Sequence, residues 1–156
     1  MTNPLKYTCL FGGGAIRGMA YIGTIRALEE LNIEYDIIGG SSVGSIMAAL
    51  VACGYKSYEL ENLFMKVNFD LFKDIHLGFG KPFALSKGEI FLDWLNELLA
   101  KKINVHGNNI TFKDLEQKLV IITTDLTKFG SQEFSALTTP DFEIAQAIKI
   151  SSSMPG

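Results

Sequence analysis

The sequence has few of the residues that build a metal centre or a disulfide framework. Its 156 residues include only two cysteines, Cys9 and Cys53, and two histidines, His76 and His106. Two cysteines cannot form the disulfide framework of a small secreted protein, and no zinc-site spacing is present. The apolar runs around the cysteines instead predict buried free thiols. We expect the protein to use neither a metal nor another cofactor.

Long apolar runs and clusters of positive charge are also missing. Residues 1–7 lack the apolar stretch of a signal peptide, and the apolar segment 45–53 is too short to span a bilayer. A cytoplasmic location is therefore the expectation. The net charge is −3 and the basic residues are scattered, which argues against a nucleic-acid partner. With 47% hydrophobic and 20% charged residues, the composition is typical of a globular domain.

Strand-like and helix-like segments alternate along the chain. Short apolar runs predict strands at 6–11, 36–39, 119–123 and 132–135. Apolar periodicity, capping residues and Gly54 at a C′ position predict helices at 15–31, 43–53, 58–67 (capped by Ser57) and 87–102, a short one from a capping box at 111–114, and a last one that starts at Thr139-Pro140. The pattern predicts one three-layer α/β domain over 1–156, with a mainly parallel central sheet and right-handed crossovers that place helices on both faces.

The most specific motif is Gly40-Ser41-Ser42-Val43-Gly44, which fits G-x-S-x-G between a predicted strand and a predicted helix. A strand can reverse into a helix this sharply only if Cβ clashes are removed, and Gly40 and Gly44 remove them. Ser42 is then left at the apex, at a helix N-terminus that favours negative charge. These features make Ser42 a candidate nucleophile. A Gly/Ser turn that merely caps the helix is the simpler interpretation.

A glycine-rich loop follows the first predicted strand. Its successive backbone N–H groups can point at one oxygen, as in an oxyanion hole or a phosphate cradle, and Arg17 adds a fixed charge. In a parallel sheet this loop would lie beside the serine turn, so nucleophile and oxyanion donors would converge on one carbonyl, as acyl transfer requires. The candidate donors are Gly12, Gly13, Gly14 and Ala15.

Other interpretations of the glycine loop fit less well. A dinucleotide site needs G-x-G-x-x-G, and Gly18 comes one residue too late. That site also needs an acid at the end of the second strand, where Gly39 and Gly40 stand. A P-loop needs G-K-[ST] after the glycines, which is absent. A purely structural turn is the remaining alternative.

These motifs together resemble the patatin-like phospholipase family. The resemblance is carried by residues 12–23, 27–30 and 39–45, and continues in 124–126 and 151–156. It implies a serine lipid acyl hydrolase that uses a Ser–Asp dyad and an acyl-enzyme. The family's nucleophile falls on Ser42, its oxyanion glycines on residues 12–14, and its basic position on Arg17. A lipid or phospholipid acyl ester is the implied substrate.

The family's catalytic aspartate, which sits in an Asp-Gly pair, has no match in this sequence. No Asp-Gly pair occurs, so we expect the aspartate to follow residue 156 and the chain to be C-terminally incomplete. Asp125 matches a family position without a catalytic role, and we expect it to bond to nearby backbone. The aromatic stretch 69–83 could line an acyl-chain channel or make transient contact with a membrane surface, although simple packing explains most of its rings.

Two alternatives remain open at this point. An α/β-hydrolase triad would use His106 with Asp70, Asp74 or Asp93, but that fold places more strands before its nucleophile than 41 residues allow. The other alternative is a patatin-fold binding or scaffold module without catalysis. Under a dyad mechanism neither histidine is needed.

Overall fold

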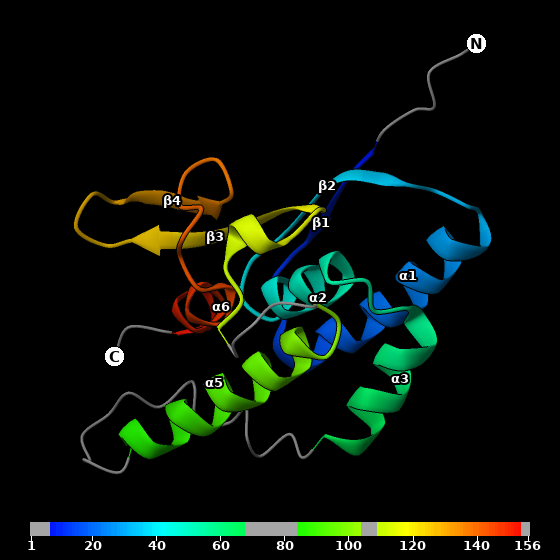
Figure 1. The fold of residues 1–156 in the computed structure, drawn as a ribbon, viewed down its shortest axis with the longest axis horizontal. Coiled ribbons are helices and arrows are strands. Elements are labelled where there is room, and N and C mark those ends of the chain that lie inside the picture. Colours follow the sequence, from blue (N-terminus) through cyan, green and yellow to red (C-terminus); the bar gives the residue numbers. More distant parts are fainter. Residues whose placement is uncertain (1–6, 68–83, 104–108, 154–156) are drawn as a thin grey trace.

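The computed structural model describes residues 7–67, 84–103 and 109–153, with side chains omitted for 84–88. The elements alternate between strand and helix, as Figure 1 shows. In chain order they are β1 (Tyr7–Phe11), η1 (Ala15–Met19), α1 (Ala20–Glu30), β2 (Tyr35–Gly40), α2 (Val43–Ala52), α3 (Ser57–Lys66), α5 (Ala84–Ala100), η3 (Phe112–Asp114), β3 (Lys118–Asp125), β4 (Gly130–Ser135) and α6 (Ile144–Ser152).

The four strands form one sheet in the order β1-β2-β3-β4. β1, β2 and β3 are parallel, and β4 returns antiparallel to β3 as a hairpin. Gly40 at the end of β2 lies between Phe11 of β1 and Ile121 of β3. The mainly parallel sheet is therefore confirmed, and the ends of β1 and β2 share one edge.

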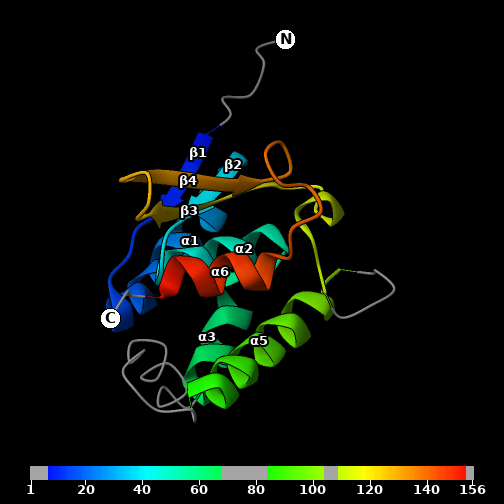
Figure 2. The ribbon, with the colours of Figure 1, turned by 90° about the vertical axis from the view of Figure 1, so that its left-hand side faces the viewer.

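The elements stack in three layers, which confirms the three-layer α/β class. Figure 2 shows the sheet, then α1, α2 and α6, then α3 and α5. The expectation of helices on both faces is wrong for the described residues, since their helices all lie on one side of the sheet. The reason is the strand order: β1 to β2 and β2 to β3 step in the same direction, so two right-handed crossovers fall on the same face.

Helix α2 occupies the centre of this stack. Eight of its ten residues are buried, including Met47 and Leu50. It contacts all three parallel strands as well as α5 and α6. A helix that is apolar all round is stable only when it is covered on every side. Its start, where Ser42 lies, is consequently held between the sheet edge and α6.

Several predicted helix boundaries differ from the structure, among them the start of the helix predicted at 87–102, which begins at Ala84. α6 begins at Ile144 rather than at Thr139, because Thr139 accepts a hydrogen bond from the Phe142 N–H in a turn and Glu143 then pairs as an extended residue with Thr111. The predicted helix 15–31 is divided into η1 and α1.

Ser57 is not the cap of α3, because Lys56 takes that position and its N–H donates to Glu59. The Ser57 N–H and hydroxyl both donate to Glu29 of α1, which fixes α3 against α1. Where the signals were local the predictions are confirmed: Gly54 follows α2 with φ 93°, and Thr111 and Asp114 form a capping box.

The two cysteines have different environments. Cys53 is buried, and this burial raises the pKa of its thiol to about 12. Cys9 is only partly buried, so the expectation of a buried thiol is wrong for this residue, although burial still raises its pKa.

Within the described ranges, no helix has the length and apolar character needed to cross a bilayer.

Candidate active site

Ser42 lies at the apex of the turn between β2 and α2 in a strained backbone conformation. Its φ is 52° and its ψ is −130°, outside the regions that a non-glycine residue normally adopts. Such strain persists only where surrounding structure imposes it, and it clusters at functional sites. The Ser42 side chain makes no capping hydrogen bond to α2, so helix capping does not explain this serine.

The glycines on either side of Ser42 are required by close backbone contacts. A Cβ on Gly40 would collide with the carbonyl group of Gly44. A Cβ on Gly44 would collide with the carbonyl of Phe11 and approach within 2.6 Å of the Gly12 oxygen. The turn therefore packs directly onto the end of β1, as the G-x-S-x-G pattern predicts.

The glycine loop lies against Ser42. A Cβ built on Gly13 would be 3.5 Å from the Cβ of Ser42. The Gly12 carbonyl accepts a hydrogen bond of 3.0 Å from the Tyr21 hydroxyl, so this carbonyl already has a partner. In the part of the chain that the structure describes, the N–H groups of Gly13 and Gly14 donate to no acceptor. These are among the N–H groups that the sequence indicated as candidate oxyanion donors.

The segment after the glycines is held by α2. Ala15 has a φ of 48° and starts η1. A Cβ on Gly18 would come within 2.8 Å of both Val43 methyl groups, so glycine at this position lets η1 pack onto the start of α2. Arg17 is exposed and forms no ion pair with a described acid.

Ser151 of α6 holds the backbone of the candidate nucleophile. The Ser42 N–H donates to the Ser151 oxygen at 2.9 Å, and the Ser151 hydroxyl donates to the Ile122 carbonyl of β3 at 2.7 Å. The Ser151 hydroxyl, which lies 109 residues after Ser42 in the sequence, thus ties the turn to β3. Segment 151–156 contributed to the family resemblance, but no local pattern indicated this contact, so sequence reasoning missed its role.

Replacement of Ser151 by alanine is expected to lower turnover while leaving substrate affinity nearly unchanged. The Ser42 N–H would lose its partner and the strained turn could relax, and a small misplacement of a reacting group costs about 100-fold in rate. The measurement is the separate determination of kcat and KM for the full-length protein on an acyl ester. Ser151→Thr keeps the hydroxyl and should restore most of the turnover. Equal losses in both variants, or a change in KM alone, would contradict this positioning role.

Asp125 acts as a turn residue, as expected. Its Oδ1 accepts hydrogen bonds from the N–H and hydroxyl of Thr127 and from the N–H of Lys128. These bonds, those from Thr127 first, hold the pKa of the Asp125 carboxyl below its usual value. The Asp125 carboxylate therefore stabilises the β3–β4 turn.

Of the other candidate acids and bases, only Asp93 is among the described residues. No described side chain forms a hydrogen bond with the Ser42 hydroxyl. Asp93 is an exposed residue of α5. His76, His106, Asp70 and Asp74, together with the aromatic stretch 69–83, lie outside the described residues. Among the described residues, no group of three potential metal ligands comes together.

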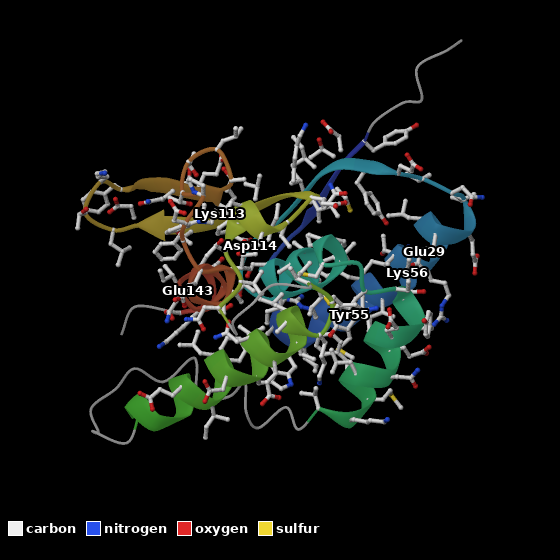
Figure 3. The ribbon with its side chains drawn as sticks, in the orientation of Figure 1. Glu29, Tyr55, Lys56, Lys113, Asp114 and Glu143 are labelled. Carbon is white, nitrogen blue, oxygen red and sulfur yellow. The ribbon has the colours of Figure 1, made fainter. Side chains whose placement is uncertain are left out.

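A separate pocket of about 440 Å³ lies at the opposite end of the sheet from Ser42. Tyr35, at the start of β2, and Tyr55, just after α2, line it together with Glu29 and Lys56. Figure 3 shows the last three where α1, α2 and α3 meet. Since the serine turn follows the other end of β2, this pocket is not the place where an ester would meet Ser42.

Comparison with known proteins decides the family. The family model described as patatin-like phospholipase matches residues 10–156. The chain belongs to this family. This patatin-like chain is 32% identical over 167 residues to a probable lipid hydrolase, 463L, of Invertebrate iridescent virus 6, covering 98% of the chain and 55% of that relative. It is 28% identical to the cGAMP-activated phospholipase of Vibrio cholerae, covering 96% of the chain and 46% of that relative.

Solved structures agree with this assignment. ExoU of Pseudomonas aeruginosa, in its complex with SpcU, matches 97% of the patatin-like chain and 39% of its own chain with a TM-score of 0.74 and 28% identity. VipD of Legionella pneumophila shares the fold, with a TM-score of 0.69, 18% identity, 98% of this chain and 44% of its own covered. The chain spans about half the length of the curated relatives it matches.

Proposed function

We propose that this patatin-like chain carries the nucleophile and oxyanion hole of a serine hydrolase that cleaves acyl esters of lipids. The observation that carries the proposal is Ser42 itself: a strained serine whose hydroxyl caps nothing, with the glycine loop packed against it. Its position at the N-terminus of a buried helix favours the negative charge that develops during acyl transfer. Family membership supports a hydrolase acting on lipid.

In the proposed reaction the Ser42 oxygen attacks the ester carbonyl carbon while its proton passes to a general base. The carbonyl oxygen becomes an oxyanion, which accepts hydrogen bonds from the free N–H groups of the loop formed by Gly12, Gly13, Gly14 and Ala15. The alcohol leaves with a proton from the base, and an acyl-enzyme remains. Water then attacks this ester and gives a proton to the base, and the base returns that proton to the Ser42 oxygen as the fatty acid is released.

We assign the general base to an aspartate that follows residue 156, which makes the catalytic pair a Ser–Asp dyad. Asp125, the acid nearest the end of β3, is engaged by Thr127 and Lys128 and has no contact with Ser42 among the described hydrogen bonds. Arg17, exposed in η1, is proposed to meet a charged head group of the substrate. We also propose transient contact with a membrane surface, since a lipid ester must be reached there.

A non-catalytic lipid-binding or scaffold module is the second candidate, and it shares every feature of the fold. The two functions differ in whether Ser42 reacts. A fluorophosphonate probe, which forms a covalent bond with activated serines, should label the full-length protein once per chain. Ser42→Ala should remove the labelling, and Ser41→Ala should keep it. Labelling that survives in Ser42→Ala, or folded protein that is never labelled, would contradict the hydrolase proposal.

A further inference from the structure

Three segments that are distant in sequence lie toward the edge of the sheet where Ser42 lies. The loop 12–18 follows β1 there, because Phe11 pairs with Gly40 at the end of β2. The β3–β4 turn, 126–129, continues from the neighbouring strand at the same edge. The last turn of α6 is held there through the hydrogen bonds of Ser151 to Ser42 and Ile122.

Each of these segments exposes an apolar side chain directly beside a basic residue. In the loop Ile16, which is 60% exposed, precedes the exposed Arg17. In the other two segments the basic residue comes first. The apolar residue that follows it is Phe129 in the β3–β4 turn, which is 94% exposed, and Ile150 in α6, which is 45% exposed. We call these six residues the rim: Ile16, Arg17, Lys128, Phe129, Lys149 and Ile150.

Charge is distributed unevenly between the rim and the rest of the chain. The whole chain has a net charge of −3, whereas the rim carries three basic residues and no acid. The acid nearest to it in sequence is Asp125, whose carboxylate is engaged by Thr127 and by the backbone and side chain of Lys128. With Lys128 offset by Asp125, the edge around Ser42 still presents the positive charges of Arg17 and Lys149 together with apolar tips, a combination that suits an anionic lipid surface.

The β3–β4 hairpin projects beyond the serine turn. β3 continues for four residues past Ile121, the partner of Gly40, which corresponds to about 13 Å of strand. Figure 1 shows the hairpin extending away from the helices. At its tip Phe129 has a φ of 49°, a conformation that bulky residues rarely adopt. Packing within the described chain does not explain this phenylalanine, since its side chain is almost fully exposed.

We propose that the rim is the surface by which this chain docks on a lipid bilayer. Its apolar tips enter the boundary between head groups and acyl chains, and its basic side chains pair with lipid phosphates and carboxylates. Docking in this way brings lipid esters to the edge that holds Ser42. The inference deepens the proposed function and rests on it for the identity of the substrate, while the docking itself can be measured without any hydrolysis.

Vesicle binding by a tip variant tests the rim. All proteins would carry Ser42→Ala, so that no lipid is consumed, and co-sedimentation with phosphatidylcholine vesicles containing phosphatidylserine would give the partition coefficient. Phe129→Asn should lower it about tenfold, because the ring no longer enters the interface. Asparagine tolerates the left-handed backbone at this position, so the fold should be preserved, as a thermal melt would check.

Leu137→Asn is the matched control. Leu137 is also 94% exposed, but it follows β4 at the other end of the hairpin, where Ser135 pairs with Val120. This variant should bind vesicles as the parent protein does. Equal binding by both variants, equal losses in both, or no vesicle binding by the parent would overturn the proposal. Removing phosphatidylserine should weaken binding by the parent, and binding indifferent to this lipid would contradict the role of the basic residues.

The docking result can be separated from the proposed function. With Ser42 restored in the full-length protein, Phe129→Asn should hydrolyse a short-chain soluble ester at the parent rate and vesicle lipid more slowly. If the parent fails to hydrolyse the soluble ester while vesicle binding still depends on Phe129, the hydrolase proposal fails and the rim stands. If the parent hydrolyses the soluble ester and the Phe129 variant matches the parent on vesicles, the docking proposal is contradicted and the hydrolase proposal stands.

Discussion

Ser42→Ala is expected to abolish ester hydrolysis by the full-length protein. Removal of the nucleophile from a serine hydrolase costs about 10⁶-fold in turnover. The strained turn should survive the change, because it is held by backbone contacts and by the bond from the Ser42 N–H to Ser151 rather than by the lost hydroxyl. Initial rates on a chromogenic acyl ester, with circular dichroism as a check of folding, provide the measurement.

Ser41→Ala is the control for this result. Ser41 contributes its backbone to the turn, donating to the Phe11 carbonyl and accepting from the Gly44 N–H. Alanine keeps both bonds, so most of the activity should remain. An inactive Ser41 variant beside an active Ser42 variant would show that the nucleophile has been assigned to the wrong serine.

Gly44→Ala is expected to lower the free energy of unfolding by about 3 kcal/mol. Its Cβ would meet the carbonyl groups of Phe11 and Gly12, which belong to backbone that cannot rotate away. Either β1 moves from α2 or the turn opens, and both separate the glycine loop from Ser42. Hydrolysis should be lost together with stability. Urea unfolding followed by circular dichroism gives the free energy and shows whether its denaturant dependence is unchanged.

Gly23→Ala provides the matched comparison. Gly23 lies in the interior of α1, and a Cβ there meets no described atom within 4 Å. Alanine is a better helix former than glycine by about 1 kcal/mol, so this variant should be more stable than the parent and fully active. If Gly23→Ala and Gly44→Ala destabilised the protein equally, the close contact at Gly44 would not be the cause.

The serine turn and the glycine loop have a structural role that coincides with their proposed chemical role. Gly40 and Gly44 let a strand, a helix and the end of β1 approach within backbone contact, and the same approach puts Ser42 against the glycine loop at Gly13. A module without catalysis would need the first role only. The reactivity of Ser42 with a fluorophosphonate therefore distinguishes the two proposed functions more directly than any measurement of the fold.

The sequence alone determined the features whose physical causes are local. The glycines at 40 and 44 predicted a sharp turn, because only glycine fits where the backbones come this close. The spacing of Thr111 and Asp114 predicted the capping box that they form. Gly54 predicted the end of α2, because glycine readily adopts the left-handed conformation found there. Alternating strands and helices also predicted a mainly parallel sheet, because a strand that follows a helical crossover returns parallel to the one before it.

Only the tertiary structure decided which distant residues meet. Ser151 supports Ser42 across 109 positions, and Glu29 takes both hydrogen-bond donors of Ser57, so that Ser57 does not cap its helix. The start of α6 moved from Thr139 to Ile144 because Glu143 pairs with Thr111. These contacts depend on how α6, α1 and the sheet pack. The sequence does not show which distant group will form a hydrogen bond with a given hydroxyl or carboxylate, because packing decides which groups come within about 3 Å.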